Sequence, residues 1–205
     1  MRTLARFGVA VGYTLAFVVT DLVFRTRSPS GRAAWLEWTS TNLVNLRHHP
    51  VAALVASAFF AEGSILTWTV LALVGLGVVN ASLGNWRTAL LVGAAHVVGT
   101  LISEGILAYR IGHGDAPASD RLIVDVGPSY VVTCALVAGI CYGPGLFRLL
   151  PAAGFALLAP SLFGGLPHLE VSSVGHLCAV MIAVMVGWPL WRGRAPARAP
   201  ATAAI

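Results

Sequence analysis

The sequence predicts an all-α membrane protein: a polytopic bundle of about six transmembrane helices, with a membrane-embedded loop after the first helix. Of the 205 residues, 57% are hydrophobic and only 10% are charged, and the mean hydropathy is +0.81. Soluble domains carry about 25% charged residues, so a soluble fold of this length could not bury so much apolar surface. At roughly 20 residues for each span, the length leaves no room for a large soluble domain.

The apolar segments define the individual spans. The first covers about residues 5–24 and continues up to Arg25, which indicates a retained span rather than a cleaved signal peptide. Residues 51–64 are apolar over too short a stretch to cross a bilayer, and they indicate an interfacial or re-entrant segment. The other predicted spans are about residues 65–83, 87–109, 126–142, 145–163 and 172–191.

These spans form one predicted domain, residues 1–191, and the Pro- and Ala-rich residues 192–205 are expected to be a disordered cytoplasmic tail. With both termini inside, seven of the 13 basic residues lie on the inner side. The inner loops are short, where the positive-inside rule works best, so we expect cytoplasmic termini. All basic residues are Arg and they are scattered along the chain, which argues against nucleic-acid binding.

The cysteines carry no predicted chemistry. Cys134, Cys141 and Cys178 lie inside apolar stretches and form no CxxC pair, which is typical of small buried hydrophobic residues. The polar spans offer no Cys and His set with metal-ligand spacing, so we expect neither a metal nor another cofactor.

The third span carries a stripe of polar residues. His96, Thr100 and Glu104 follow one another at intervals of four and therefore lie on one helix face. Ionisable groups inside a membrane are costly, so this face must meet the bundle interior or a wet cavity. The stripe fits a structural hydrogen-bond network or a proton pathway. A small transporter that used His96 and Glu104 would predict paired broken spans or an inverted repeat, and the sequence has neither.

Two further polar residues lie at the starts of spans. Ser129, in "IVDVGPSYVVTC", opens the fourth span, and His176 lies about one turn inside the sixth. If the small-residue faces of these spans pack together, Ser129 and His176 meet near the outer ends of their helices. The His could then take the hydroxyl proton and activate the Ser as a nucleophile. Alternatively, Ser129 caps its helix and His176 is a structural residue. The small residues are Ala135, Ala138 and Gly139 in the fourth span and Ala179, Ala183 and Gly187 in the sixth.

The order of these features resembles the rhomboid family of intramembrane serine proteases. That family has a six-span core, an embedded loop after the first span, a Gly-x-Ser motif opening the fourth span and a His in the sixth. Gly127-Pro128-Ser129 is similar to the first motif, and "GHLCAVMIAVMVG", which contains His176, is similar to the second. "HHPVAALVASAFFAEGS" resembles the embedded loop, and "LGNWRTALLV" resembles the turn between the second and third spans. The likeness covers about residues 5–191, and "DVGPSY" looks closest to a divergent rhomboid-like group from high-GC bacteria.

The resemblance implies a Ser129–His176 dyad that cleaves single-span membrane proteins near the outer face, with Gly127 letting backbone donors approach the oxyanion. The sequence departs from the family pattern at several positions. Tyr130 replaces the Gly that usually follows the Ser, and Thr133 replaces an aromatic ring that stacks on the His. A His and an Asn that support the oxyanion fall at Ser64 and Trp68, although Ser64 or Thr67 could donate one hydrogen bond.

Two functions therefore remain open. The first is an intramembrane serine protease, and the second is a catalytically inactive rhomboid-like protein that binds transmembrane helices. The loss of one oxyanion donor can cost about 10²–10³ in rate, which favours the second, whereas retention of both Ser129 and His176 favours the first. In either case we expect a multi-pass protein of a bacterial cell membrane whose partners are lipid and a transmembrane helix. The sequence does not indicate the oligomeric state.

Overall fold

The computed structural model describes residues 6–61 and 63–193, and this part of the chain is helical and contains no strand. The predicted tail falls largely on residues 194–205, outside the described residues. The α-helices are α2 (Gly8–Arg25), α3 (Pro29–Thr39), α4 (Leu43–His48), α5 (Pro50–Ser57), α6 (Ile65–Leu83), α7 (Asn85–His113), α8 (Ser129–Tyr142), α9 (Leu149–Phe163), α10 (Val171–Met185) and α11 (Gly187–Arg192). Three 3₁₀ turns are η1 (Ala118–Leu122), η2 (Gly145–Arg148) and η3 (Leu166–His168).

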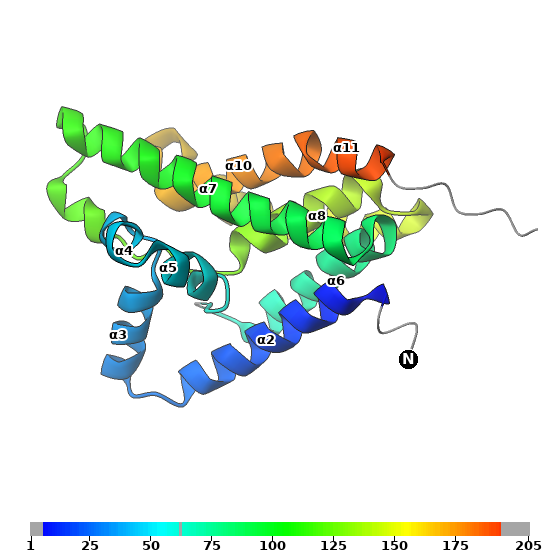
Figure 1. Cartoon of the computed structure of the whole chain (residues 1–205), viewed down its shortest axis with the longest axis horizontal. Coiled ribbons are helices and arrows are strands. Elements are labelled where there is room, and N and C mark those ends of the chain that lie inside the picture. The colour runs from blue at the N-terminus through cyan, green and yellow to red at the C-terminus, as the bar shows by residue number, and fades with distance from the viewer. Residues whose placement is uncertain (1–5, 62, 194–205) are drawn as a thin grey trace, which may run out of the picture.

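Five segments of the described chain are long and apolar enough to cross a membrane: Gly8–Arg25, Ile65–Leu83, Asn85–His113, Gly145–His168 and Val171–Arg192. Together with the shorter α8 they run back and forth along the long axis, so that the described chain begins and ends at the same end of the bundle (Figure 1). The predicted all-helical membrane bundle is therefore confirmed.

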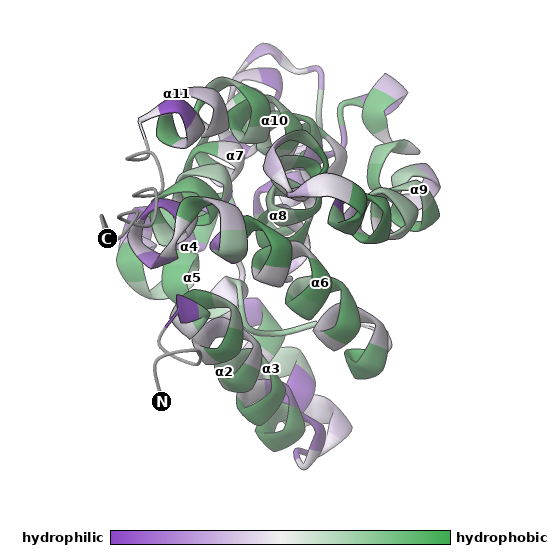
Figure 2. Ribbon diagram, turned by 90° about the vertical axis from the view of Figure 1, so that its right-hand side faces the viewer, coloured by the Kyte–Doolittle hydropathy of each residue, from purple (hydrophilic) through white to green (hydrophobic). Residues whose placement is uncertain are grey.

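The predicted fourth span, residues 126–142, is shorter than expected. Helix α8 has 14 residues and begins only at Ser129, which gives a length of about 21 Å against about 30 Å for a bilayer core. It lies in the middle of the bundle with α6, α7, α9 and α10 packed around it (Figure 2). Residues 130–139 are all buried, so α8 can begin below the membrane surface without exposing its end to lipid.

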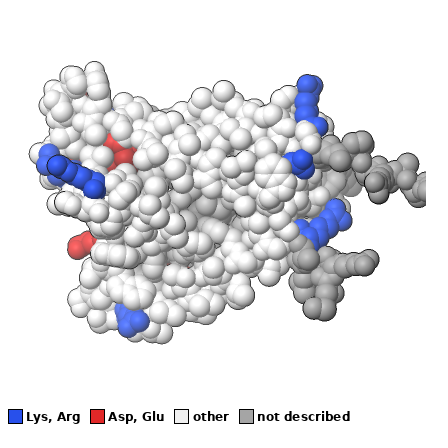
Figure 3. Space-filling model, in the orientation of Figure 1, with Lys and Arg blue, Asp and Glu red and all other residues white. Residues whose placement is uncertain are grey.

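On the face that Figure 3 shows, charged side chains lie at the two ends of the molecule. Figure 3 shows a broad uncharged belt between basic groups at one end and mixed charges at the other. The belt carries exposed apolar side chains such as Leu15, Leu66 and Leu157, which are 61%, 69% and 72% exposed. An apolar surface of this extent is what a lipid environment requires.

The polar stretch after the first span folds into α3 and α4, and residues 50–61 form the predicted embedded segment. Its helix, α5, has only eight residues, and Ala53 and Ser57 on it are buried in protein. Two contacts hold the second half of α5: Gly127 N–H donates to Ser57 O at 2.8 Å, and His96 Nε2 lies 2.8 Å from Leu54 O. The backbone after α5 is not helical, and there Tyr13 Oη donates to Ala58 O at 2.8 Å. Irregular backbone at membrane depth is tolerated where protein covers it in this way.

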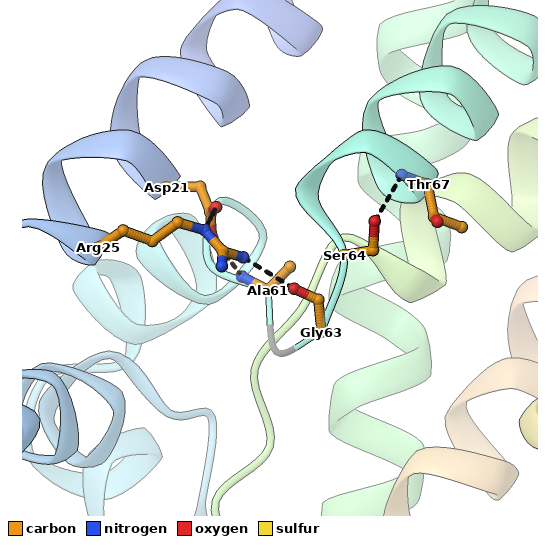
Figure 4. Close-up of polar contacts among 6 residues, drawn as sticks. All are labelled: Asp21, Arg25, Ala61, Gly63, Ser64 and Thr67. Carbon is orange, nitrogen blue, oxygen red and sulfur yellow. Dashed lines mark hydrogen bonds and ion pairs between the residues drawn. The ribbon is translucent and has the colours of Figure 1, made fainter.

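The end of the embedded segment is also tied to α2 (Figure 4). The fully buried Asp21 carboxylate pairs with Arg25 at 2.5 Å and accepts a hydrogen bond from Ala61 N–H at 3.4 Å. Arg25 also donates to Gly63 O at 2.9 Å. This ion pair fixes the entrance to α6.

Helix α8 packs against α10, and Gly187 lies against Tyr142 at the end of α8, but two of the small residues of α8, Ala135 and Gly139, lie against other helices. A Cβ on Gly75 of α6 would lie 3.1 Å from Ala135, and one on Gly139 would lie 3.0 Å from Pro151 of α9. Ala135 and Gly139 of α8 thus allow α6 and α9 to approach α8 closely. The side of α8 toward α10 instead carries the ring of Tyr130, which fits because Gly175 has no side chain.

Candidate functional site

Ser129 is the first residue of α8. Pro128 precedes it as the N-cap residue, and the helix start has no side-chain cap. Within residues 6–61 and 63–193, the Ser129 hydroxyl has no hydrogen-bond partner. The structure therefore does not show Ser129 capping its helix, and the residue is half-buried.

Gly127 shapes the backbone in front of this serine. Its φ of +147° lies in a region that side chains disfavour. A Cβ at this position would lie 3.7 Å from Ser129 Oγ and 3.9 Å from Phe60 O. Glycine thus permits the turn into α8 and keeps one side of the serine hydroxyl open.

His176 lies in the second turn of α10 and is 6% exposed. Its Nδ1 is 3.0 Å from Leu162 O, one of the last carbonyls of α9, which have no partner within their helix. A carbonyl can only accept, so Nδ1 carries the proton and Nε2 presents a lone pair. Among the described residues, this buried Nε2 has no hydrogen-bond partner.

One cavity brings Ser129 and His176 together. Its volume is about 220 Å³, and the two side chains line it without a direct hydrogen bond between them. Catalytic hydrogen bonds are often long before substrate binds. The lining residues are Ala61, Trp68, Val126, Gly127, Pro128, Ser129, Ser161, Leu162 and His176.

Few donors face the position where an oxyanion would form. Gly127 N–H is already bonded to Ser57 O, and Pro128 has no N–H. The N–H of Ser129 itself is unpaired among the described residues. It lies at the positive end of the α8 dipole, where a negative charge is favoured.

The two side chains suggested as oxyanion donors lie elsewhere. Ser64 caps α6 by accepting from Thr67 N–H at 3.3 Å (Figure 4). Neither Ser64 nor Thr67 lines the cavity, whereas Trp68 does. Their proposed role stays a prediction.

The polar stripe of α7 is buried inside the bundle: His96 is 6%, Thr100 0% and Glu104 1% exposed. His96 Nε2 contacts both Leu54 O and, at 3.2 Å, Ser57 Oγ, so it joins α7 to the embedded segment. Among the described residues, the Thr100 hydroxyl and the Glu104 carboxyl oxygens have no partner. None of the three stripe residues lines the Ser129 cavity.

Sequence reasoning missed the part that Tyr130 plays. It treated Tyr130 only as a departure from the family pattern, yet its ring lies edge-on to His176 with ring centroids 5.1 Å apart and planes at 84°. The same ring lies 6.1 Å from that of His96. The signal in the sequence is Gly175, directly before His176, which leaves room for a large neighbour.

In the described part of the chain, no three His, Cys, Asp or Glu side chains gather as metal ligands. The polar side chains that line the cavity include the hydroxyls of Ser129 and Ser161 and the imidazole of His176.

The fold and the surface define a multi-pass membrane protein built of helices, with a serine and a histidine in one cavity of its core. The chain matches the family of rhomboid-like proteins over residues 7–197 and belongs to that family. This confirms the family resemblance read from the sequence. No curated protein and no solved structure matches the chain.

Proposed function

We propose that the protein is an intramembrane serine protease in which Ser129 is the nucleophile and His176 the general base. The proposal rests on the hydrogen bonding of the Ser129 and His176 side chains in the cavity that they share. The serine hydroxyl is uncapped, and Leu162 O fixes the proton of His176 on Nδ1, which leaves Nε2 as the base.

The chemistry follows from these atoms. Ser129 Oγ attacks a peptide carbonyl carbon while His176 Nε2 takes the hydroxyl proton, and the carbonyl oxygen becomes an oxyanion beside Ser129 N–H. His176 then returns the proton to the leaving amine as the C–N bond breaks. A water molecule, deprotonated by His176, hydrolyses the acyl-enzyme and restores Ser129. General-base assistance of this kind is worth about 10²–10⁴-fold in rate.

The test is labelling of the purified, detergent-solubilised protein with a fluorophosphonate probe, which reacts with activated serines. We expect labelling of the wild-type protein and none of Ser129→Ala or His176→Ala. Ser172→Ala and His168→Ala are matched controls, because both residues are outside the cavity, and we expect them to label normally. A folded wild-type protein that takes no label contradicts the proposal.

A second candidate is an inactive protein that binds transmembrane helices. It is favoured by the scarcity of oxyanion donors, since Gly127 N–H is bonded to Ser57 O and Ser64 is used as a helix cap. This function predicts no labelling of Ser129. It also predicts that a membrane-helix client, trapped by a photo-crosslinker at Trp68, stays intact in the wild-type protein and in Ser129→Ala alike.

We also propose that both termini face the cytoplasm. At the end of the bundle where the described chain begins and finishes (Figure 1), the charged residues among those described are Arg6, Arg87, Arg148 and Arg192, and none of these is acidic. The opposite end carries mixed charges, so the distribution agrees with the positive-inside rule. Fusion of green fluorescent protein or alkaline phosphatase to the C-terminus tests the orientation: fluorescence without phosphatase activity supports it, and the reverse refutes it.

A further inference from the structure

Asp125 lies in the loop before α8 and is clamped by the corner between α3 and α4. Its N–H donates to Ser40 Oγ at 2.9 Å. Its carbonyl accepts from both the N–H and the hydroxyl of Thr41, each at 3.0 Å. The Thr41 hydroxyl also lies 3.3 Å from the Asp125 carboxylate. Ser40 and Thr41 are 0% and 1% exposed, so this clamp is part of the packed structure.

Tyr130 links Asp125 to the interior of the helix bundle. Its hydroxyl donates to Asp125 Oδ2 at 3.0 Å and lies 3.4 Å from Val171 O on α10. Glycines leave room for the ring on two sides. A Cβ at Gly175 would lie only 2.2 Å from Tyr130 Cζ, and one at Gly99 would lie 3.6 Å from Cδ2. The ring, which is 3% exposed, therefore cannot move unless α7 or α10 moves.

Two contacts limit the orientation of the His176 imidazole. One is the hydrogen bond from Nδ1 to Leu162 O, which fixes one edge of the ring but leaves its tilt about that bond free. The other is the edge-on contact with Tyr130, which blocks that tilt. Thr133, where the family pattern has an aromatic ring, is buried with its hydroxyl unpaired among the described residues, and it has no ring that could stack on the imidazole.

We propose that Asp125 and Tyr130 form a positioning pair: Asp125 anchors the Tyr130 hydroxyl, and the anchored ring holds the His176 imidazole in the orientation that presents Nε2 to Ser129. The proposal rests on the proposed function for its catalytic meaning. Tyr130 touches the base and not the substrate, so it is a positioning residue. On this proposal Tyr130, which directly follows the nucleophile and departs from the family pattern, belongs to the site.

Four variants test the Tyr130 ring and its hydrogen bond to Asp125 separately. Tyr130→Leu removes the ring, and Tyr130→Phe keeps the ring but cuts the anchor. Asp125→Ala removes the acceptor, and Asp125→Asn keeps an acceptor oxygen. Tyr142→Leu is the matched control, because Tyr142 is a buried tyrosine at the other end of α8 whose hydroxyl bonds to Val184 O.

The first readout is the rate of fluorophosphonate labelling. A misplacement of about 1 Å in a catalytic group can cost about 10²-fold, so we expect Tyr130→Leu to slow labelling by about 10–100-fold. Tyr130→Phe and Asp125→Ala should show smaller losses. Asp125→Asn and Tyr142→Leu should label at the wild-type rate, provided that each variant elutes as a single species.

The second readout does not depend on activity. In protein carrying ¹³C-labelled histidine, the His176 ring signal is assigned by its absence in His176→Gln. The Tyr130 ring current acts on this signal, so Tyr130→Leu should shift it and Tyr130→Phe should largely preserve it.

The two readouts distinguish failure of this proposal from failure of the proposed function. If Tyr130→Leu changes neither the labelling rate nor the His176 signal, the positioning pair is overturned while the protease function stands. If the wild-type protein takes no label, the protease function fails. The signal then decides the pair alone: a shift in Tyr130→Leu supports it, and an unchanged signal overturns it.

Discussion

Gly175→Ala is the substitution whose effect the structure predicts most directly. The added Cβ would lie 2.2 Å from Cζ and 2.3 Å from Oη of Tyr130, whereas carbon atoms in contact prefer about 3.5–4.0 Å. Either the ring or helix α10 must therefore move by more than about 1 Å. Helix α10 is also held from the other side, because Gly175 O lies 3.2 Å from the position of a Cβ on Gly99 of α7.

The expected change in the free energy of unfolding combines two costs and one gain. Overpacking of a close contact costs about 1–3 kcal/mol. Displacement of the ring weakens the bond from Tyr130 to Asp125, which is worth about 0.5–1.5 kcal/mol. Alanine in a helix is favoured over glycine by about 1 kcal/mol. The net loss is about 0.5–3.5 kcal/mol, or about 1–14 °C in Tm at 2–4 °C for each kcal/mol.

The assay is thermal unfolding of the purified protein in detergent. Gly93→Ala is the control, since a Cβ at Gly93 of α7 would meet nothing within 4 Å, and its Tm should be unchanged or higher. Adding Tyr130→Leu to Gly175→Ala should restore room, so that the two substitutions together cost less than the sum of their separate effects. If Gly175→Ala melts at the wild-type temperature, or the double variant shows plain additivity, the close packing of Tyr130 on α10 is wrong.

Four further predictions concern the surroundings of the site. Gly127→Ala should lower Tm by an amount equivalent to about 1–3 kcal/mol and slow fluorophosphonate labelling. Gly63→Ala, also at positive φ but with nothing within 4 Å of its Cβ, should lower Tm without slowing labelling, and equal labelling losses would contradict the role given to Gly127. Arg25→Ala leaves the fully buried Asp21 carboxylate without its partner and should lower Tm more than Asp21→Asn; the reverse order would refute the pairing. His96→Leu cuts the bond to Leu54 O and should cost about 1–3 kcal/mol, whereas the exposed His113→Ala on the same helix should melt like the wild type, and equal Tm values for both would remove His96 as a link. Burial raises the pKa of the Asp125 carboxyl above its ordinary value of 3.8, although the hydrogen bonds from Tyr130 and Thr41 oppose this rise. Its protonated form therefore stabilises the folded state below that ordinary value, and this stabilisation is lost as pH rises through the raised pKa. Asp125→Asn should match the wild-type Tm at acidic pH and exceed it increasingly at higher pH, and a constant difference across the titration would contradict this.

Several features of the site could be predicted from single residues. Ser129 and His176 stand out because polar groups at the starts of apolar spans are few, and Gly127 because the family resemblance includes a Gly-x-Ser motif. The packing that brings them together could not be predicted in the same way. The small residues of α8 could have faced any neighbour, and the structure turns Ala135 toward α6 and Gly139 toward α9 while Tyr130 faces α10. In lipid, where small residues let any two helices approach, spacing alone does not choose the partner.

The sequence by itself determined the membrane bundle, the number and order of its apolar segments and the short embedded segment, because hydropathy and span length depend only on local composition. Only the tertiary structure decided that Leu162 O holds the proton of His176 on Nδ1, that Gly127 N–H donates to Ser57 O, and that the Tyr130 ring lies edge-on to the imidazole. These outcomes depend on which carbonyls and rings come within hydrogen-bond or van der Waals distance. That distance is set by how residues far apart in the chain pack around α8.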